Sequence, residues 1–357
     1  MLQTKNRVLW IDIAKAFAIL LVVFGHTIRG GCIQGVVYGF HVPAFFLLAG
    51  MTCSTTNIAS RIRKDFLRIM VPYYVFGLAS ILIFTVLGSV AADKLSMDVD
   101  TSFTKNLVEL LVMNPKGGRM KFNLPLWFLP CLFAVKCVYY GLVKLFRDNQ
   151  IKILIASLVL CVIGFVYTGL GGPSLPFNFS VALKMMVFFA FGQWMMRLIS
   201  EKKVRFIGGW LSCIPGVLFL IVAALVGWFV PAVNYSGDTF PDLIAFVITS
   251  TTGSVGLCLV AMAIGKSKIL AYIGKNTLAI LVMHKFPVLL FQTVGPLKGP
   301  LTWYDDPLGM LCGLAVSVAA IGICLAVGWF INRFLPFLFG DFSCFVKKSA
   351  NCGSENQ

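Results

Sequence analysis

The feature that most constrains this chain is a series of ten apolar runs, each close to 20 residues long. A helix of about 20 apolar residues spans the hydrocarbon core of a bilayer. Hydrophobic residues make up 59% of the sequence, charged residues make up 12%, and the mean hydropathy is +0.89. We therefore expect an all-α polytopic membrane protein with about ten transmembrane helices in one bundle. The predicted spans cover residues 9–28, 34–54, 69–91, 124–146, 151–170, 179–199, 208–230, 241–264, 273–294 and 308–334.

The short loops between these runs predict the orientation of the bundle. Lys and Arg gather in the cytoplasmic loops of membrane proteins. Here they follow the second, fourth, sixth and eighth runs, whereas loops 171–178 and 231–240 contain neither. We therefore expect both termini in the cytoplasm, a membrane domain over 1–345 and a short polar cytoplasmic tail over 346–357. The basic loop residues are Arg61, Arg63, Lys64 and Arg68, then Lys144, Arg147 and Lys152, then Lys202, Lys203 and Arg205, and finally Lys266, Lys268 and Lys275.

The charge and the cysteines argue against two other classes of protein. The net charge is +16, but much of it lies in the loops that set topology, and no recognition fold accompanies it. The 11 cysteines are scattered, mostly within apolar runs, and form no CxxC pair. We expect no nucleic-acid partner and no metal site.

Three ionisable residues share one face of the first run, namely Asp12, Lys15 and His26. A helix turns about 100° per residue, so the steps from Lys15 to His26 make about three whole turns and cover about 16 Å. Ionisable groups in a lipid-spanning helix are costly, and they usually face a bundle interior or a wet cavity. The stripe therefore predicts a pathway or a reaction site on this helix.

Other polar residues also lie at membrane depth. His41, in the second run, is expected near the outer leaflet with His26, where the two imidazoles could meet across one hairpin. His284 lies mid-span in the ninth run, where a structural hydrogen bond is the better-supported interpretation. A structural role remains open for the other two histidines. Lys136 and Lys184 either reach the interface or line a cavity.

The segment from Arg61 to Arg68 allows two interpretations. Its cations could anchor the chain to anionic lipid head groups. They could also hold a phosphorylated cytoplasmic cofactor, because the arginine fork matches phosphate oxygens. Composition alone favours the lipid anchor.

Several sequence blocks resemble the integral-membrane acyltransferase-3 family, most closely its branch of fucose 4-O-acetylase and related polysaccharide acetyltransferases. The early blocks are Ile11-Asp12-Ile13-Ala14-Lys15 to Gly25-His26 and Phe40-His41-Val42-Pro43-Ala44-Phe45-Phe46 with Ala49-Gly50. Leu126-Trp127-Phe128-Leu129-Pro130 and Gly274-Lys275-Asn276-Thr277 to His284 resemble later blocks.

The resemblance implies an O-acyltransferase that takes an acetyl or other acyl group from cytoplasmic acyl-CoA. Its acceptor would be a sugar hydroxyl of a surface glycan or of a lipid-linked precursor, and its location the bacterial inner membrane. His26 matches the family's catalytic histidine. Two positions depart from the family: Lys15 stands where arginine is common, and Asp65 precedes Arg68 where an Arg-x-x-Arg pair is common.

The expected roles follow from this chemistry. A neutral histidine suits the removal of a proton from a sugar hydroxyl, so we predict His26 as the base and His41 as a second catalytic candidate. Alternatively, His26 carries the acyl group covalently before passing it on. Lys15, with Asp12 holding it, is expected to bind the phosphates of the donor together with Arg61, Lys64 and Arg68. Trp127, Asn123 and His284 are candidates for acceptor binding, although Trp127 also fits an interfacial aromatic belt.

A secondary transporter of a polar or anionic solute is the alternative from another class. Polar mid-span residues and Gly or Pro interruptions would suit one, but no repeat between the two halves is evident.

Overall fold

The computed structural model describes residues 8–28, 30–95, 102–115, 120–201, 209–293 and 306–342. The expected tail 346–357 and the loop residues Lys202, Lys203 and Arg205 lie outside these ranges. Within them the chain is helical and contains no named strand, and nine helical segments are long and apolar enough to cross a membrane. The prediction of an all-α polytopic membrane protein is confirmed.

The helices follow one another in the order that the apolar runs predict. Short 3-10 segments precede α6 and α8 and follow α14, and a π-helical segment joins α3 to α4. The helices are α1 (Leu9–Thr27), α2 (Gly31–Met51), α3 (Ile58–Asp65), the π segment (Phe66–Met70), α4 (Val71–Leu95), α5 (Phe103–Val112), α6 (Phe128–Leu145), α7 (Gln150–Gly169), α8 (Phe179–Ser200), α9 (Trp210–Trp228), α10 (Leu243–Ile264), α11 (Lys268–Lys275), α12 (Thr277–Met283), α13 (Lys285–Thr293) and α14 (Pro307–Phe334).

The prediction of one continuous helix over 273–294 is wrong. Three short helices, α11, α12 and α13, occupy this part of the chain, with breaks at Asn276 and His284. The Asn276 amide donates to a backbone carbonyl four residues earlier (2.8 Å), and His284 Nδ1 lies within 3.0 Å of two carbonyls of the preceding turn. Side chains that bond to the backbone in this way compete with the helical pattern, and Pro287 removes a further N–H donor.

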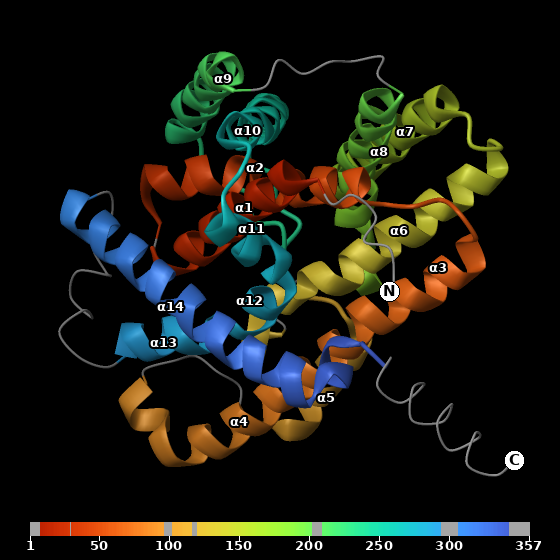
Figure 1. The fold of residues 1–357 in the computed structure, drawn as a ribbon. Coiled ribbons are helices and arrows are strands. Elements are labelled where there is room, and N and C mark those ends of the chain that lie inside the picture. Colours follow the sequence, from red (N-terminus) through yellow and green to blue (C-terminus); the bar gives the residue numbers. More distant parts are fainter. Residues whose placement is uncertain are drawn as a thin grey trace, which may run out of the picture.

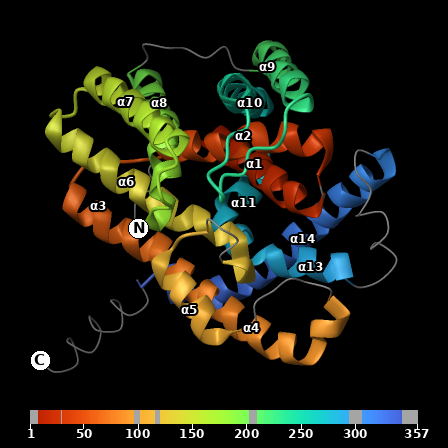
Figure 2. The same cartoon turned by 180° about the vertical axis from the view of Figure 1, so that it is seen from behind.

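The α1–α2 hairpin lies at the centre of the bundle (Figure 1). Helices α8, α9 and α10 pack against α2, while α11 and α14 pack against α1. Seen from behind, α7 to α10 again lie on one side of the hairpin, and α4, α5 and α13 lie on the other (Figure 2). The two N-terminal helices, which carry His26 and His41, are therefore enclosed by later parts of the chain.

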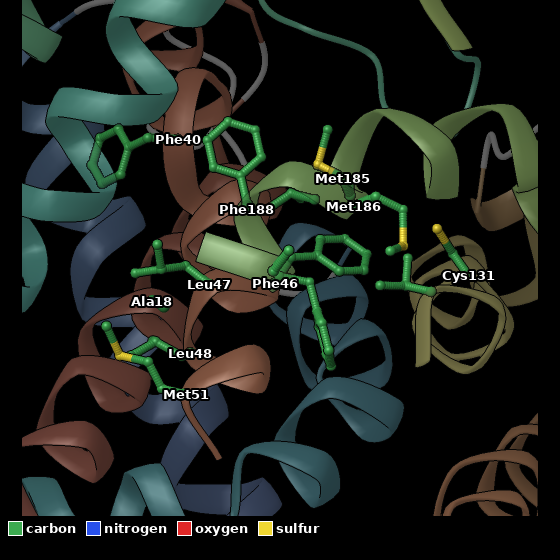
Figure 3. Packing of buried hydrophobic residues seen from close by; sticks show 14 of the residues in the cluster. Ala18, Phe40, Phe46, Leu47, Leu48, Met51, Cys131, Met185, Met186 and Phe188 are labelled. Atoms are coloured by element: carbon green, nitrogen blue, oxygen red, sulfur yellow. The ribbon is translucent and has the colours of Figure 1, made fainter. Parts of the chain in front are cut away.

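Helices α2 and α8 approach closely through a pair of glycines. A Cβ added to Gly50 would overlap the carbonyl oxygen of Phe189, and one added to Gly192 would overlap that of Leu47. Small residues allow such contact between membrane helices. Around them, Phe46 and its neighbours on α2 interlock with Met185 and other side chains of α8 (Figure 3). This packing supports the helix that carries His41.

Helix α1 is fixed from another side by α11. A Cβ added to Gly274 would overlap the carbonyl oxygen of Asp12, so glycine is needed where the two backbones meet. The Asp12 side chain is buried in the same region, at 4% exposure. The contact joins the two segments that contain the first and last sequence blocks.

Candidate active site

A cavity of about 550 Å³ lies within the bundle and touches both the basic segment and the intramembrane histidines. Lys15, Arg61 and Arg68 line it at one end, and His26 and His41 line it at the other. On α1 the two ends are separated by the rise from Lys15 to His26, about 16 Å. Lys15 and His26, two of the three residues predicted to share a face of α1, therefore border one continuous cavity. Asp12, the third, is buried where α1 meets α11 and is not among the lining residues.

Aromatic rings and imidazoles gather at the histidine end. The His26 ring lies 5.3 Å from the His284 ring and 6.3 Å from the Tyr38 ring, measured between centroids. Tyr38 in turn lies 4.9 Å from His41, and Tyr235 lies 5.9 Å from His41, again between ring centroids. Tyr38 thus contacts both His26 and His41, and His284 approaches His26 from the break between α12 and α13.

Hydrogen bonds define which nitrogens of two of these histidines carry the proton. His41 Nδ1 lies 2.7 Å from the carbonyl oxygen of Val37, and His284 Nδ1 lies near two carbonyl oxygens. A carbonyl only accepts, so each Nδ1 donates and each Nε2 is an acceptor in the neutral ring. His284 Nε2 is buried and has no partner among the described residues. The ring of His26 is part-exposed to the cavity.

The basic end contains an ion pair that neutralises Asp65. Lys136 Nζ lies 2.5 Å from one oxygen of this carboxylate, and the Tyr140 hydroxyl donates to the other at 2.7 Å. Lys136 therefore lies in the cavity wall. Within the described ranges, Arg61 and Arg68 form no salt bridge, so their charges remain available to an anion.

The π segment contributes to the placement of Arg68. Gly340, at a φ of 73°, brings the chain after α14 against the backbone of Leu67 and Arg68, where a Cβ would overlap. Such π segments are frequent at functional sites. Lys64, one helical turn before Arg68, is exposed and does not line the cavity.

A cysteine thiol also borders the basic end. Cys53 follows α2, and its Sγ lies 3.6 Å from the Tyr140 hydroxyl. Burial raises the pKa of the Cys53 thiol, which keeps it protonated. A protonated thiol is a poor nucleophile, so the histidines are better placed for acyl chemistry.

The predicted acceptor residues occupy different environments. Trp127 lines the cavity, and its ring is nearly parallel to that of Tyr235 (9°, centroids 6.4 Å apart). Asn123 lies outside the lining and is fully buried; its amide donates to Ser80 Oγ (3.1 Å) and to the carbonyl oxygen of Val282 (3.0 Å). Asn123 therefore joins α4 to α12, and Trp127 alone of the two faces the cavity.

The chain matches the model of the acyltransferase-3 family, described as an acyltransferase domain, over residues 8–346. This range holds the α1–α2 hairpin, the basic segment and the cavity between them. The chain belongs to the acyltransferase-3 family. No curated protein and no solved structure matches it. It is an integral-membrane acyltransferase, and the described residues contain no cluster of His, Cys, Asp and Glu suited to a metal ion.

Several residues of this acyltransferase cavity were not predicted from the sequence. Tyr38 could have been found, because it lies three residues before His41 and so shares a helix face with it. For Lys136 the sequence left a cavity position open, but no local pattern reveals its network with Asp65 and Tyr140, which joins two helices. Tyr235 lies in the polar loop 231–240, and the position of this loop depends on contacts with residues that are distant in sequence.

Proposed function

We propose that this acyltransferase transfers an acetyl group from acetyl-CoA to a sugar hydroxyl of a surface glycan or of its lipid-linked precursor. The observation that carries the proposal is one continuous cavity with Arg61 and Arg68 at one end, which form no salt bridge with the residues that the structure describes, and with His26 and His41 at the other. The chain would act in the bacterial inner membrane, with the basic end of the cavity toward the cytoplasm.

The basic end supports a donor that carries phosphates. Guanidinium groups bind phosphate oxygens in a bidentate manner, and Arg61 and Arg68 line the cavity. Lys15 lies on the same wall and adds a third cation. The pairing of Lys136 with Asp65 removes the negative charge that would oppose a phosphate there. The acyl end of the donor would then extend along α1 toward His26.

At the histidine end, His26 would act as the base. In direct transfer, its unprotonated nitrogen takes the proton of the sugar hydroxyl while the oxygen attacks the thioester carbonyl carbon. The carbon–sulfur bond then breaks, and the imidazolium returns the proton to the departing thiolate. In the covalent alternative, the His26 nitrogen attacks the thioester carbon, the carbon–sulfur bond breaks and the CoA thiolate leaves. The sugar oxygen then attacks the same carbon, the carbon–nitrogen bond breaks, and the freed imidazole takes the proton of the sugar hydroxyl. The arrangement suits both routes.

We assign His284 the role of orienting His26. Its Nε2 is an acceptor, is buried and lacks a partner among the described residues. The His26 ring, 5.3 Å away, can donate its N–H to this nitrogen after a small rotation. That bond would hold the proton of His26 on one nitrogen and leave the other free to act as the base.

Glycan analysis of cells with and without the gene tests the proposal. We expect mass spectrometry of surface glycans to show an acetyl increment of one sugar residue in cells that carry the gene. The increment should disappear on deletion and return with the wild-type gene. Isolated membranes should also move label from acetyl-CoA into the same glycan. Identical glycans in all strains, together with no transfer in membranes, would contradict the proposal.

A further inference from the structure

The loop over residues 231–240, between α9 and α10, forms a wall of the cavity at the histidine end. Asn234, Tyr235 and Ser236 all line the cavity. Because Tyr235 contacts His41 and is nearly parallel to Trp127, the loop lies beside the proposed reaction centre. The basic segment follows the other end of α2, so this wall is remote from the proposed donor phosphates.

A buried ion pair holds this loop against α8. Lys184 Nζ lies 2.6 Å from Asp238, and both side chains are 1% exposed. Ser180 Oγ donates to the second carboxylate oxygen at 2.5 Å, and the Lys184 ammonium lies 4.4 Å from the centroid of the Phe240 ring. Burying two charges is costly, so such a pair contributes more to a defined geometry than to stability.

Further contacts fix the residues that face the cavity. The Asn178 amide donates to the backbone oxygen of Tyr235 at 3.0 Å. Asn234 Oδ1 accepts from the N–H of Gly237 and from the hydroxyl of Ser236, both at 2.9 Å. Within the described part of the chain, no acceptor takes the protons of the Asn234 Nδ2 group. The loop therefore holds an aromatic ring in place beside the exposed Asn234 amide.

This combination suits a sugar ring. Tyr235 and Trp127 border the cavity with the small exposed parts of their rings, 2% and 7% of each residue, which can contact the C–H groups of a pyranose. Asn234 and Ser236 offer polar groups for its hydroxyls. Burial raises the pKa of the Tyr235 phenol, so the ring carries no charge that would disturb a neutral ligand. A preformed site of this kind loses little freedom when its ligand binds.

We propose that Asn234, Tyr235 and Ser236 form, with Trp127, the subsite for the sugar ring whose hydroxyl is acetylated. The proposal rests on the proposed function, because it takes the acceptor to be a sugar. A lipid-linked sugar and a soluble polysaccharide present the same ring chemistry, so both are included in the test.

The test measures acetyl transfer by the full chain in proteoliposomes with labelled acetyl-CoA. In one arm the acceptor probe is a total lipid extract of the organism that carries the gene. In the other arm it is the soluble surface polysaccharide of the same organism. Each probe is varied at saturating acetyl-CoA, and acetyl-CoA is varied at saturating probe. The variants are Tyr235→Leu, Tyr235→Phe and Asn234→Ala. Thr239→Ala is the control, since Thr239 is an exposed residue of the same loop outside the cavity lining.

We expect Tyr235→Leu and Asn234→Ala to raise the half-saturating amount of the accepted probe about tenfold, the effect of losing one good contact. The KM for acetyl-CoA should stay within about twofold, which also reports intact folding. Tyr235→Phe, which keeps the ring, should raise the half-saturating amount less than Tyr235→Leu does, and Thr239→Ala should resemble the wild type.

An unchanged half-saturating amount of probe in Tyr235→Leu and Asn234→Ala would overturn the subsite. An equal rise in the KM for acetyl-CoA would overturn it as well, because the loop would then have only a structural role. If the wild type transfers acetyl to neither preparation, the proposed function fails and the subsite fails with it. If the wild type transfers acetyl and the loop variants have the same kinetics as the wild type, only the subsite proposal is contradicted and the proposed function stands.

Discussion

Removal of the Lys136 ammonium tests whether the basic end of the cavity binds the donor. The substitution Lys136→Met keeps most of the length of the side chain but leaves the Asp65 carboxylate with the Tyr140 hydroxyl as its remaining partner among the described residues. A negative charge about 10 Å from a donor phosphate, at an effective dielectric constant of about 20, repels it by about 1.7 kcal/mol. We therefore expect the KM for acetyl-CoA to rise about 15-fold, with a smaller change in kcat.

The same substitution should also destabilise the protein. Both side chains are 15% exposed, and removing one partner of a largely buried pair costs about 3 kcal/mol. The double variant Lys136→Met with Asp65→Asn removes both charges, so its KM should return to within about threefold of the wild type. Lys144→Met, at an exposed position near the end of α6, is the matched control and should not alter the KM.

The assay is acetyl transfer in membranes at varied acetyl-CoA, with thermal unfolding of the detergent-solubilised protein as the measure of stability. An unchanged KM in Lys136→Met would refute the reasoning. A double variant whose KM remains as high as that of the single variant would refute it too, because the increase in KM would then not come from the charge of Asp65.

Three further predictions concern other parts of the account. Gly192→Leu should destabilise the solubilised protein by about 1–3 kcal/mol and so lower its melting temperature, because the new side chain would clash with α2. Gly322→Leu, at a position with open space around it, should not, and equal melting temperatures of the two variants would contradict the α2–α8 contact. His284→Phe should lower kcat about 10- to 100-fold, while His284→Gln, which keeps an acceptor near the position of Nε2, should retain more activity; equal losses would exclude the orienting role. Lys15→Ala should raise the KM for acetyl-CoA about tenfold and Lys15→Arg should restore it; donor binding unaffected by the alanine variant would remove Lys15 from the donor site.

Much of the fold could be predicted because a membrane imposes a simple rule on sequence. Apolar runs of span length indicate where the helices lie, and the structure contains helices at these places. The helical period also placed Lys15 and His26 on one face, and both line the cavity. The prediction of a single helix for the ninth run was wrong because apolar composition gives no information about the hydrogen bonds from the side chains of Asn276 and His284 to the backbone.

The cavity walls were harder to predict because they depend on pairs that are distant in sequence. Lys184 could be recognised only as a cation at membrane depth; its partner Asp238 lies 54 residues away, in a loop of ordinary polar composition. Tyr235 is held by this pair and by the Asn178 amide, which also lies far away in the sequence, so no local pattern marks it. For the same reason Asn123 was predicted to face the acceptor, whereas its amide bonds to α4 and α12.

The most direct test of the central claim is acetyl transfer by the variant His26→Gln. Glutamine can form a hydrogen bond but cannot accept a proton near neutral pH, so the substitution separates catalysis from helix packing. We predict a folded, membrane-inserted protein that binds acetyl-CoA like the wild type and transfers acetyl to glycan at least about 100-fold more slowly. Near-normal transfer by this variant would contradict the account and would make His26 a structural residue.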